Sequence, residues 1–332
     1  MRPITYLRLD DAEAASRTSA SGNVAASQQF IAGGTTVLDL MKLDVQTPGT
    51  LIDINGLARQ HAEIVSDADG LRLGALACMA DAAEHPAVLR DYPVIAQSLK
   101  LAASQQLRNM ASLGGNVLQK TRCSYFRDTR WSACNKREPG SGCAARDGNN
   151  RQHAVLGIGA DCIATYAGDF AQALIALNAS VDTIRNGQSR VTPFAQLHRG
   201  PERPDIETNL LPGEIITGFT VPAGPWTRRS TYLKIRDRQS YEFAVASAAV
   251  ALELDGDHVR TARIALGGVA YRPWRSHEAE AELDGCVLDE QSAEAAGRAA
   301  FAQARPSGEN SYKIELGRRT LVRALLQAKG LS

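Results

Sequence analysis

The sequence predicts an α+β protein with mixed sheets in its first part and an antiparallel sheet with helices in its second part. Short apolar runs alternate with helical spacing through the first part of the chain. Two long strand-like stretches, residues 230–255 and 259–269, then meet at the turn formed by residues 255–257, and helical patterns follow. The composition changes at the Pro- and Gly-rich residues 222–225. We therefore expect one domain over residues 1–222 and a second over residues 223–332.

The individual elements follow from periodicity and from turn residues. Spacings of three and four predict helices, short apolar runs predict buried strands, and Asn-Gly or Asp-Gly marks a hairpin. In the first part we expect helices over residues 11–28, 37–41, 88–104 and 169–177, strands over 29–32, 51–54 and 162–165, and hairpins over 63–75 and 181–191. In the second part we expect helices that begin at Ser276 and at Asn310.

Composition limits the classes of function. The chain has 332 residues, 44% of them hydrophobic, and this content is enough for a sizeable core. The net charge of +1 gives no reason to expect a nucleic acid as partner. No apolar stretch has the length of a membrane span. The first residues do not resemble a secretory signal, so we expect a cytoplasmic protein by its own sequence.

Two glycine-rich turns are candidate binding sites for a phosphate group. Gly33 and Gly34 follow an apolar strand and precede a helix that Thr35 or Thr36 is expected to cap, and the second turn covers residues 111–116. Glycine lets the backbone approach a ligand, and the amides at a helix N-terminus bind anions. Neither turn has the G-x-G-x-x-G or the P-loop pattern. Each alone is more often an ordinary tight turn, but together they favour one extended anionic ligand such as FAD.

Four of the six cysteines fall within one window of forty residues, which makes them candidate metal ligands. They are Cys123, Cys134, Cys143 and Cys162. Their intervals are irregular and contain no C-x-x-C pair, which is unusual for zinc and acceptable for a [4Fe–4S] cluster. Eight bases and only three acids lie between Lys120 and Arg151, and we expect these cations to favour the thiolate form. From these residues alone, a cluster, a structural zinc and no metal all stay open. Cys78 and Cys286 are expected to be small core residues.

Three further side chains have two readings each. His153 is expected at the surface, although its position between Cys143 and Cys162 would also allow it to tune or gate a cluster. Asp169 is expected to cap a helix, or else to bind a ribityl hydroxyl. Lys234 alternates with apolar residues on a strand, so it either faces solvent or places a cation beside a flavin ring.

The chain resembles the FAD-binding medium subunits of the molybdenum hydroxylases, the xanthine dehydrogenase family. The segments that carry this resemblance are FIAGGTTVL (30–38), NMASLGGN (109–116), DFAQALIAL (169–177), LLPGEII (210–216), KIRDRQSYEFA (234–244) and IALGGVA (264–270). They occur in order over nearly the whole chain. Most medium subunits lack the cysteine loop, residues 119–162. The segments RCSYFRD (122–128) and CNKREPGSGC (134–143) look closest to the FAD subunit of periplasmic aldehyde oxidoreductases, and 4-hydroxybenzoyl-CoA reductase is similar in having such a loop.

The resemblance implies the fold, the cofactors and their ligands. It implies an FAD-binding domain of the p-cresol methylhydroxylase type, followed by the C-terminal domain of these flavoproteins. The FAD contacts it implies are Ile31, Ala32, Gly33, Gly34, Thr35, Thr36, Val37, Leu38, Ala111, Ser112, Gly115, Asn116, Asp169, Ile216 and Lys234. Among them, Asp169 would bind the ribityl or ribose region and Lys234 would lie near the isoalloxazine. The four clustered cysteines would ligate a [4Fe–4S] cluster.

The resemblance also implies partners and an activity. A molybdopterin-containing large subunit would oxidise an aldehyde, and a small subunit with [2Fe–2S] clusters would pass electrons to this chain, in a heterotrimer. FAD would then deliver them to an external acceptor, and the isolated chain would oxidise no substrate. A partner that carries a twin-arginine signal would take the complex to the periplasm. A stand-alone flavin oxidase and a zinc-stapled binding module are the alternatives.

Overall fold

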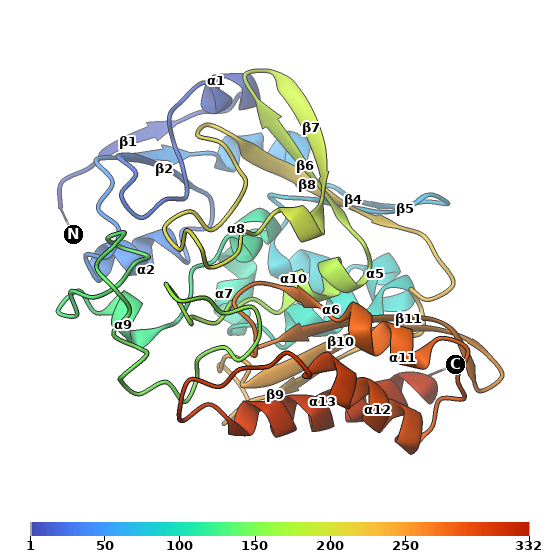
Figure 1. Cartoon of the computed structure of the whole chain (residues 1–332). Coiled ribbons are helices and arrows are strands. Elements are labelled where there is room, and N and C mark those ends of the chain that lie inside the picture. The colour runs from blue at the N-terminus through green and yellow to red at the C-terminus, as the bar shows by residue number, and fades with distance from the viewer. Residues whose placement is uncertain (1, 332) are drawn as a thin grey trace.

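The computed structural model describes residues 2–331, whose strands form three sheets (Figure 1). One sheet is small and parallel, and the other two are antiparallel, with five and four strands. The first two sheets lie in the upper half of Figure 1, and the four-stranded sheet and the last three helices lie in the lower half. The α+β fold class predicted from the sequence is confirmed.

The parallel sheet contains the predicted strand–turn–helix–strand unit. Its strands, in spatial order, are β1 (Thr5–Arg8), β3 (Thr50–Asp53) and β2 (Gln28–Ile31). Helix α2 (Val37–Lys42) makes the crossover that parallel neighbours require between β2 and β3. The turn before α2 therefore lies beyond the carboxyl end of β2. Short helices flank this sheet: α1 (Ala12–Ser16), η1 (Asn55–Leu57) and α3 (Ala58–His61).

The five-stranded sheet contains both predicted hairpins. Its spatial order is β4 (Ile64–Ser66), β5 (Gly70–Gly74), β8 (Ile215–Pro222), β6 (Ser180–Arg185) and β7 (Gln188–Pro193). Asn186 and Gly187 connect β6 to β7 with φ values of 50° and 75°. Both residues of a two-residue type I′ turn need positive φ, and Asn-Gly adopts it at low cost. The helix η2 (Phe194–Gln196) follows β7.

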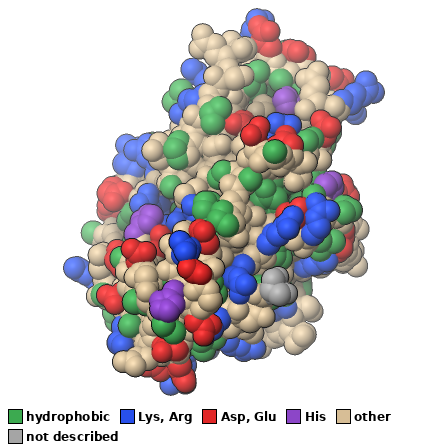
Figure 2. Space-filling model, turned by 90° about the vertical axis from the view of Figure 1, so that its right-hand side faces the viewer, with side chains coloured by type: hydrophobic (Ala, Val, Ile, Leu, Met, Phe, Trp, Pro, Cys, Tyr) green, Lys and Arg blue, Asp and Glu red, His purple; other side chains and the backbone are tan. Residues whose placement is uncertain are grey.

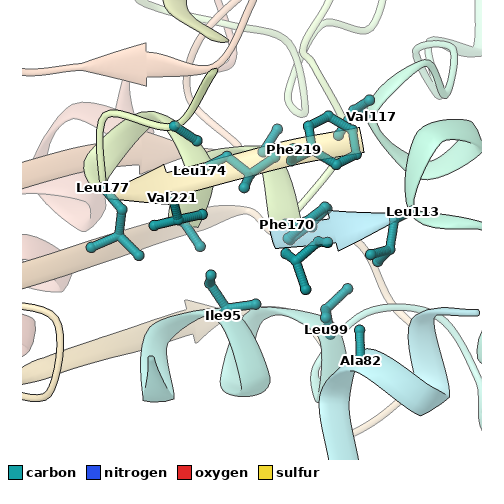
Figure 3. Close-up of a cluster of buried hydrophobic side chains, with 14 of the residues drawn as sticks. Ala82, Ile95, Leu99, Leu113, Val117, Phe170, Leu174, Leu177, Phe219 and Val221 are labelled. Carbon is teal, nitrogen blue, oxygen red and sulfur yellow. The ribbon is translucent and has the colours of Figure 1, made fainter. Parts of the chain in front are cut away.

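Most helices of the first part lie between this sheet and the C-terminal sheet (Figure 1). They are α4 (Met79–Glu84), α5 (Pro86–Asp91), α6 (Pro93–Lys100), α7 (Gln105–Met110), α8 (Leu113–Val117) and α10 (Phe170–Ala176). The short helix α9 (Ser124–Arg127) lies apart from them (Figure 1), with Phe126 packed against Leu40 of α2. Every residue of α10 is buried. In Figure 3, Phe170 lies between Phe219 of β8 and Leu99 of α6, and Leu174 lies beside Phe219 in the same core. This core also includes Leu113 and Val117 of α8, and so it holds the second glycine-rich turn in place.

The C-terminal sheet is covered on both faces. Its spatial order is β12 (Trp274–Arg275), β11 (His258–Gly267), β10 (Ala246–Asp255) and β9 (Ser230–Ile235). Three helices follow: α11 (His277–Leu283), α12 (Glu290–Ala300) and α13 (Tyr312–Lys329). Along β10, Ala249 and Ala251 join the core around α10, while Val250 and Leu252 join the core under α12 and α13. The alternation of strand side chains thus places small residues against the first part of the chain.

Three predicted elements are wrong in extent. The helix expected over 11–28 ends after Ser16, because the hydroxyls of Ser16 and Thr18 bond back to carbonyls of the last turn. The helix expected over 88–104 is split at Pro93 into α5 and α6. The strand expected over 230–255 is two strands, since residues 236–245 form a loop between β9 and β10.

One predicted strand, over residues 162–165, and two predicted helix caps are also wrong. Residues 162–165 belong to no strand, and their carbonyls bond instead to loop donors such as Ala154 and Thr121. Thr36 and Asp169 occupy N-cap positions, but neither side chain makes a capping hydrogen bond.

The surface carries mixed charges. On the face shown in Figure 2, Lys and Arg side chains alternate with Asp and Glu over both halves of the molecule. None of the helices in residues 2–331 combines the length and the hydrophobicity that a membrane crossing requires.

Candidate cofactor site

A large cavity of about 510 Å³ runs past both glycine-rich turns. We call it the large cavity. The first turn contributes residues 32–37, and the second contributes Ser112, Gly114 and Gly115. Its other walls come from residues 20–23, 117–120 and 206–216, and from Tyr271 and Arg272 of the second part of the chain. Its size is in the range of small-molecule and cofactor sites.

The two turns touch each other, as a shared ligand would require. A Cβ atom at Gly33 would overlap the backbone carbonyl oxygen of Met110, the residue before the second turn. Gly34 has a φ of 71°, which favours glycine. Only glycine at position 33 therefore lets the two backbones approach so closely.

Ser112 shapes the second turn. It is the N-cap of α8, and its hydroxyl accepts a hydrogen bond of 3.2 Å from the amide of Gly115. Leu113 and Val117 on the other side of this short helix are fully buried. The cap and the core together fix the direction in which α8 starts, beside the large cavity.

Nine of the fifteen predicted FAD contacts line the large cavity, and six do not. The nine are Ala32, Gly33, Gly34, Thr35, Thr36, Val37, Ser112, Gly115 and Ile216. Outside the lining are Ile31, Leu38, Ala111, Asn116, Asp169 and Lys234. The side chain of Asn116 turns away toward Met79, with its amide nitrogen 3.3 Å from the sulfur.

Asp169 and Lys234 are partners of each other. The Lys234 ammonium lies 2.7 Å from the Asp169 carboxylate, and the two side chains are only 1% and 4% exposed. Tyr232 also donates to this carboxylate at 2.7 Å, and Lys234 donates to the carbonyl of Leu101 at 3.0 Å. Lys234 therefore does not face solvent, and its predicted proximity to a flavin stays a prediction.

A buried ionic group at one wall of the large cavity was not anticipated from the sequence. The carboxylate of Glu207 binds the ammonium groups of both Lys120 and Lys136, the latter at 2.7 Å. Burial alone would raise the pKa of Glu207, but the two cations outweigh it and hold this pKa at about 2. Lys136 also donates to the hydroxyl of Tyr271 at 3.0 Å. No sequence pattern indicated Glu207, which lies in an irregular loop.

His198 is a neutral histidine in the wall of the same cavity. Its Nε2 donates to the carbonyl of Val117 at 3.0 Å, and the hydroxyl of Tyr166 donates to the same carbonyl at 2.9 Å. Burial lowers the pKa of His198 to about 4. This pair of hydrogen bonds connects the loop before residue 206 to the end of α8.

The four clustered cysteines surround a second, small cavity of about 20 Å³, which we call the cysteine cavity. Cys134 and Cys143 face each other across an isolated antiparallel bridge. Cys123 lies at the N-cap of α9, and Cys162 packs with Ala164 and Tyr271. Although they are up to 39 residues apart, all four thiols line this one cavity.

The expected effect of the flanking bases on the thiols is present at one cysteine, but burial outweighs it. Burial raises the pKa of Cys123 to about 12 and that of Cys162 to about 11, although the charge of Lys136 acts to lower the pKa of Cys162. The bases bind other groups: Lys120 and Lys136 bind Glu207, Arg122 and Arg127 bind Asp39, Arg130 binds Asp128, Arg137 and Arg146 bind backbone carbonyls, and Arg151 faces Asp237. Of these eight bases, Lys136 alone lines the cysteine cavity.

His153 is buried beside this cavity, which contradicts its expected surface position. Its Nε2 lies 3.2 Å from the sulfur of Cys123, and burial lowers its pKa to about 4. Within residues 2–331, no three His, Cys, Asp or Glu side chains lie close enough together to hold a single metal ion. Cys286 is exposed and Cys78 is partly exposed, so the expectation that both are core residues is wrong.

Comparison with known proteins gives the family. Residues 2–224 match the family described as FAD binding domain in molybdopterin dehydrogenase, and residues 231–328 match the CO dehydrogenase flavoprotein C-terminal domain. The chain is 47% identical to the aldehyde oxidoreductase FAD-binding subunit PaoB of Escherichia coli K12, over 99% of each chain. It is 25% identical to the carbon monoxide dehydrogenase medium chain of Hydrogenophaga pseudoflava, over 92% of this chain and 90% of that one.

Solved structures share the fold. Carbon monoxide dehydrogenase from Hydrogenophaga pseudoflava, in a form that lacks the Mo-pyranopterin moiety, matches with a TM-score of 0.75 at 24% identity, over 98% of this chain and 97% of that one. Quinoline 2-oxidoreductase from Pseudomonas putida 86 matches with a TM-score of 0.74 at 21% identity, over 99% and 97%.

Proposed function

This chain belongs to the FAD-binding medium subunits of the molybdenum hydroxylases, and we propose that it serves an aldehyde oxidoreductase as an electron-transfer subunit with FAD and a [4Fe–4S] cluster. The observation that carries the proposal is the pair of touching glycine turns at the large cavity, in a chain 47% identical to an aldehyde oxidoreductase subunit. Members of this family are oxidoreductase subunits that bind FAD.

The large cavity is the proposed FAD site. The backbone of residues 32–37 and the start of α8 would hold the pyrophosphate, beside a cavity that side chains leave open. The amides of Gly114 and Gly115 already donate to the carbonyl of Ala75 and the hydroxyl of Ser112, so the first turn would supply most of the amide donors. Ile216 would contact the cofactor from the opposite wall. Bound FAD would supply a carrier that collects electrons one at a time and releases two. Asp169 and Lys234 do not line the cavity themselves. Their proposed roles near the ribityl chain and the ring therefore require that the ion pair acts on the cofactor through the residues that do line it.

The cysteine cavity is the proposed cluster site, and its donor set fits that group. Four thiols surround one cavity, which is the ligand set of a [4Fe–4S] cluster. The backbone amides of Tyr125 and Phe126 donate to the sulfur of Cys123, and the amide of Ala164 donates to Cys162. Such amide–sulfur hydrogen bonds stabilise thiolate ligands. A single zinc ion would need ligands closer together than any three found in residues 2–331.

The proposed partners follow from the family and from the chemistry. A molybdopterin-containing large subunit would oxidise the aldehyde, and a small subunit with [2Fe–2S] clusters would deliver the electrons, in a heterotrimer. This chain would pass them to an external acceptor. A twin-arginine signal on a partner would direct the folded complex to the periplasm, and without one we expect it in the cytoplasm.

The test is the cofactor content of the complex purified with co-expressed partners. We expect FAD, iron and acid-labile sulfide in the wild-type chain. The proposed [2Fe–2S] subunit also carries iron, so iron is counted per complex. Cys123→Ser should lose the iron of one [4Fe–4S] cluster, about four atoms per complex, and keep flavin. The matched control Cys286→Ser, at an exposed cysteine, should keep both. An iron content in Cys123→Ser equal to that of the wild type would refute the ligand assignment. Aldehyde oxidation by the chain without partners would favour a stand-alone flavin oxidase.

A further inference from the structure

The large cavity and the cysteine cavity have one residue in common. Among the described residues, Lys136 alone lines both. It lies two residues after Cys134, and its side chain is 5% exposed. Its ammonium group is therefore a charge in the wall between the two proposed cofactor sites.

The buried ionic group that contains Lys136 has more positive than negative charge. The single carboxylate of Glu207 faces the two ammonium groups of Lys120 and Lys136. Arg199 and Arg272 also line the large cavity, and its other carboxylate, Glu214, is bound by Arg190. On the other side, Asp161 lines the cysteine cavity but is itself exposed to solvent. A buried excess of positive charge is costly unless an anion faces it.

Tyr271 links the ammonium group to the cysteines. Its hydroxyl accepts a hydrogen bond from Lys136, and its ring packs against Cys162. Tyr271 also lines the large cavity. The contact between the two sites thus consists of an aromatic ring and a cation that Glu207 and the ring's hydroxyl hold in place.

We propose that Lys136 is a positioning residue that raises the reduction potential of both cofactors, because its ammonium group, oriented by Glu207 and Tyr271, faces both cavities. The inference rests on the proposed function, since it requires FAD in one cavity and a cluster in the other. Each electron that enters either cofactor adds one negative charge, and a nearby fixed cation in a site of low dielectric stabilises that charge. Lys120 binds the same carboxylate but lines only the large cavity, so its charge acts on the flavin side.

The test is a redox titration of the full complex, with flavin followed by visible absorbance and the reduced cluster by electron paramagnetic resonance. Lys136→Met should lower both potentials. We expect at least a tenfold shift of the cluster equilibrium toward the oxidised form, which corresponds to 59 mV for one electron. Lys120→Met should lower the flavin potential and leave the cluster potential unchanged. Lys136→Arg, which keeps the charge, should shift both potentials less than Lys136→Met does.

Three results would overturn the inference in a wild-type complex that contains both cofactors. One is an unchanged cluster potential in Lys136→Met. Another is an equal fall of the cluster potential in Lys120→Met. The third is a loss of iron in both Lys136→Met and Lys136→Arg, because that would make Lys136 a structural support of the loop. A wild-type complex without flavin, or with no more iron than its [2Fe–2S] clusters account for, would instead overturn the proposed function itself, and this inference with it.

Discussion

The large cavity depends on a contact between two backbone turns, and the cysteine cavity depends on four side chains, although the two share Lys136. At the large cavity the decisive contact is between the turn at Gly33 and the backbone of Met110, which no side chain mediates. At the cysteine cavity, irregular loops and the short helix α9 converge through the cysteines and through packing around Tyr125 and Ile163. A backbone site depends on a few glycines and a cap, whereas a thiol site depends on each cysteine separately.

The two cavities are also attached to different parts of the molecule. The turns of the large cavity continue into α2 and α8, and α8 packs into the central core. The cysteine loop is fastened to the C-terminal part instead: Asn310 donates to the carbonyls of His153 and Ala154, and Lys313 donates to the carbonyl of Gln152. Changes in the first glycine turn should therefore affect flavin without iron, and changes in residue 310 should affect iron first.

Glu207→Gln is the change that should break both cavities together, and it should have the largest effect. It leaves the ammonium groups of Lys120 and Lys136 buried without their carboxylate. Removing one partner of a buried ion pair costs about 3–5 kcal/mol. We expect the free energy of unfolding to fall by about this amount at neutral pH, measured by denaturant unfolding.

A neighbouring surface pair provides the control for Glu207→Gln. Asp205 binds Arg203 with the arginine side chain 58% exposed, so Asp205→Asn should cost about 0–1 kcal/mol. If Glu207→Gln costs no more than Asp205→Asn, then the Glu207 group does not support the wall between the two cavities.

Acid should lower the free energy of unfolding by protonating His198, which lies in the wall of the large cavity. The folded-state pKa of His198, about 4, lies below its unfolded value of 6.5, so the unfolded chain binds the proton more readily. The stability that depends on neutral His198 is complete above pH 6.5 and is lost as the pH falls from 6.5 toward 4. At about 1.4 kcal/mol for each pH unit, the loss reaches about 3 kcal/mol.

His198→Gln is the variant that isolates this effect, because a glutamine amide also donates to a carbonyl and does not titrate in this range. We expect the difference in unfolding free energy between wild type and His198→Gln to change in favour of the variant as the pH falls from 6.5 to 4. A difference that is constant over this range would mean that His198 is not buried in its neutral form.

Gly33→Ala should damage the large cavity and spare the cysteine cavity. The new Cβ overlaps the carbonyl oxygen of Met110, a backbone atom that cannot move alone, and overpacking of this kind costs about 1–3 kcal/mol. We expect loss of bound flavin with iron retained, measured on the purified complex.

Gly49→Ala, in the loop before β3, is the matched control. A new Cβ there has only the carbonyl oxygen of Ser27 within 4 Å, at 3.9 Å, and Gly49 does not line the large cavity. Flavin content should stay close to that of the wild type. Equal flavin loss in both variants would contradict the view that contact between the two turns is what requires Gly33.

The sequence predicted the two cavities unequally, and the reason is physical. Gly33, Ser112 and the four cysteines were found because glycine turns and grouped thiols are visible within short stretches of sequence, and the family resemblance then favoured one role for each. Glu207 and His198 were missed, because their partners lie 71 to 87 and 81 residues away and only tertiary packing brings them together. The pair of Asp169 and Lys234 shows the same limit: each was noticed alone, and no local pattern indicated that they bind each other.

Ser112→Ala should have the smallest effect on stability. It tests whether the side chain of the second turn, as well as its backbone, contributes to the large cavity. Ser104 and Ser112 are both N-caps that accept a hydrogen bond from the third amide of a short helix, at 3.3 and 3.2 Å, but only Ser112 lines the large cavity. Loss of either cap costs about 1 kcal/mol, so thermal unfolding should shift by a similar amount in Ser104→Ala and Ser112→Ala. Flavin titration of the stripped complex should then separate them, with weaker binding in Ser112→Ala only. Equal flavin affinity in both variants would mean that the cap merely stabilises α8, and that the backbone of the turn binds without help from its side chain.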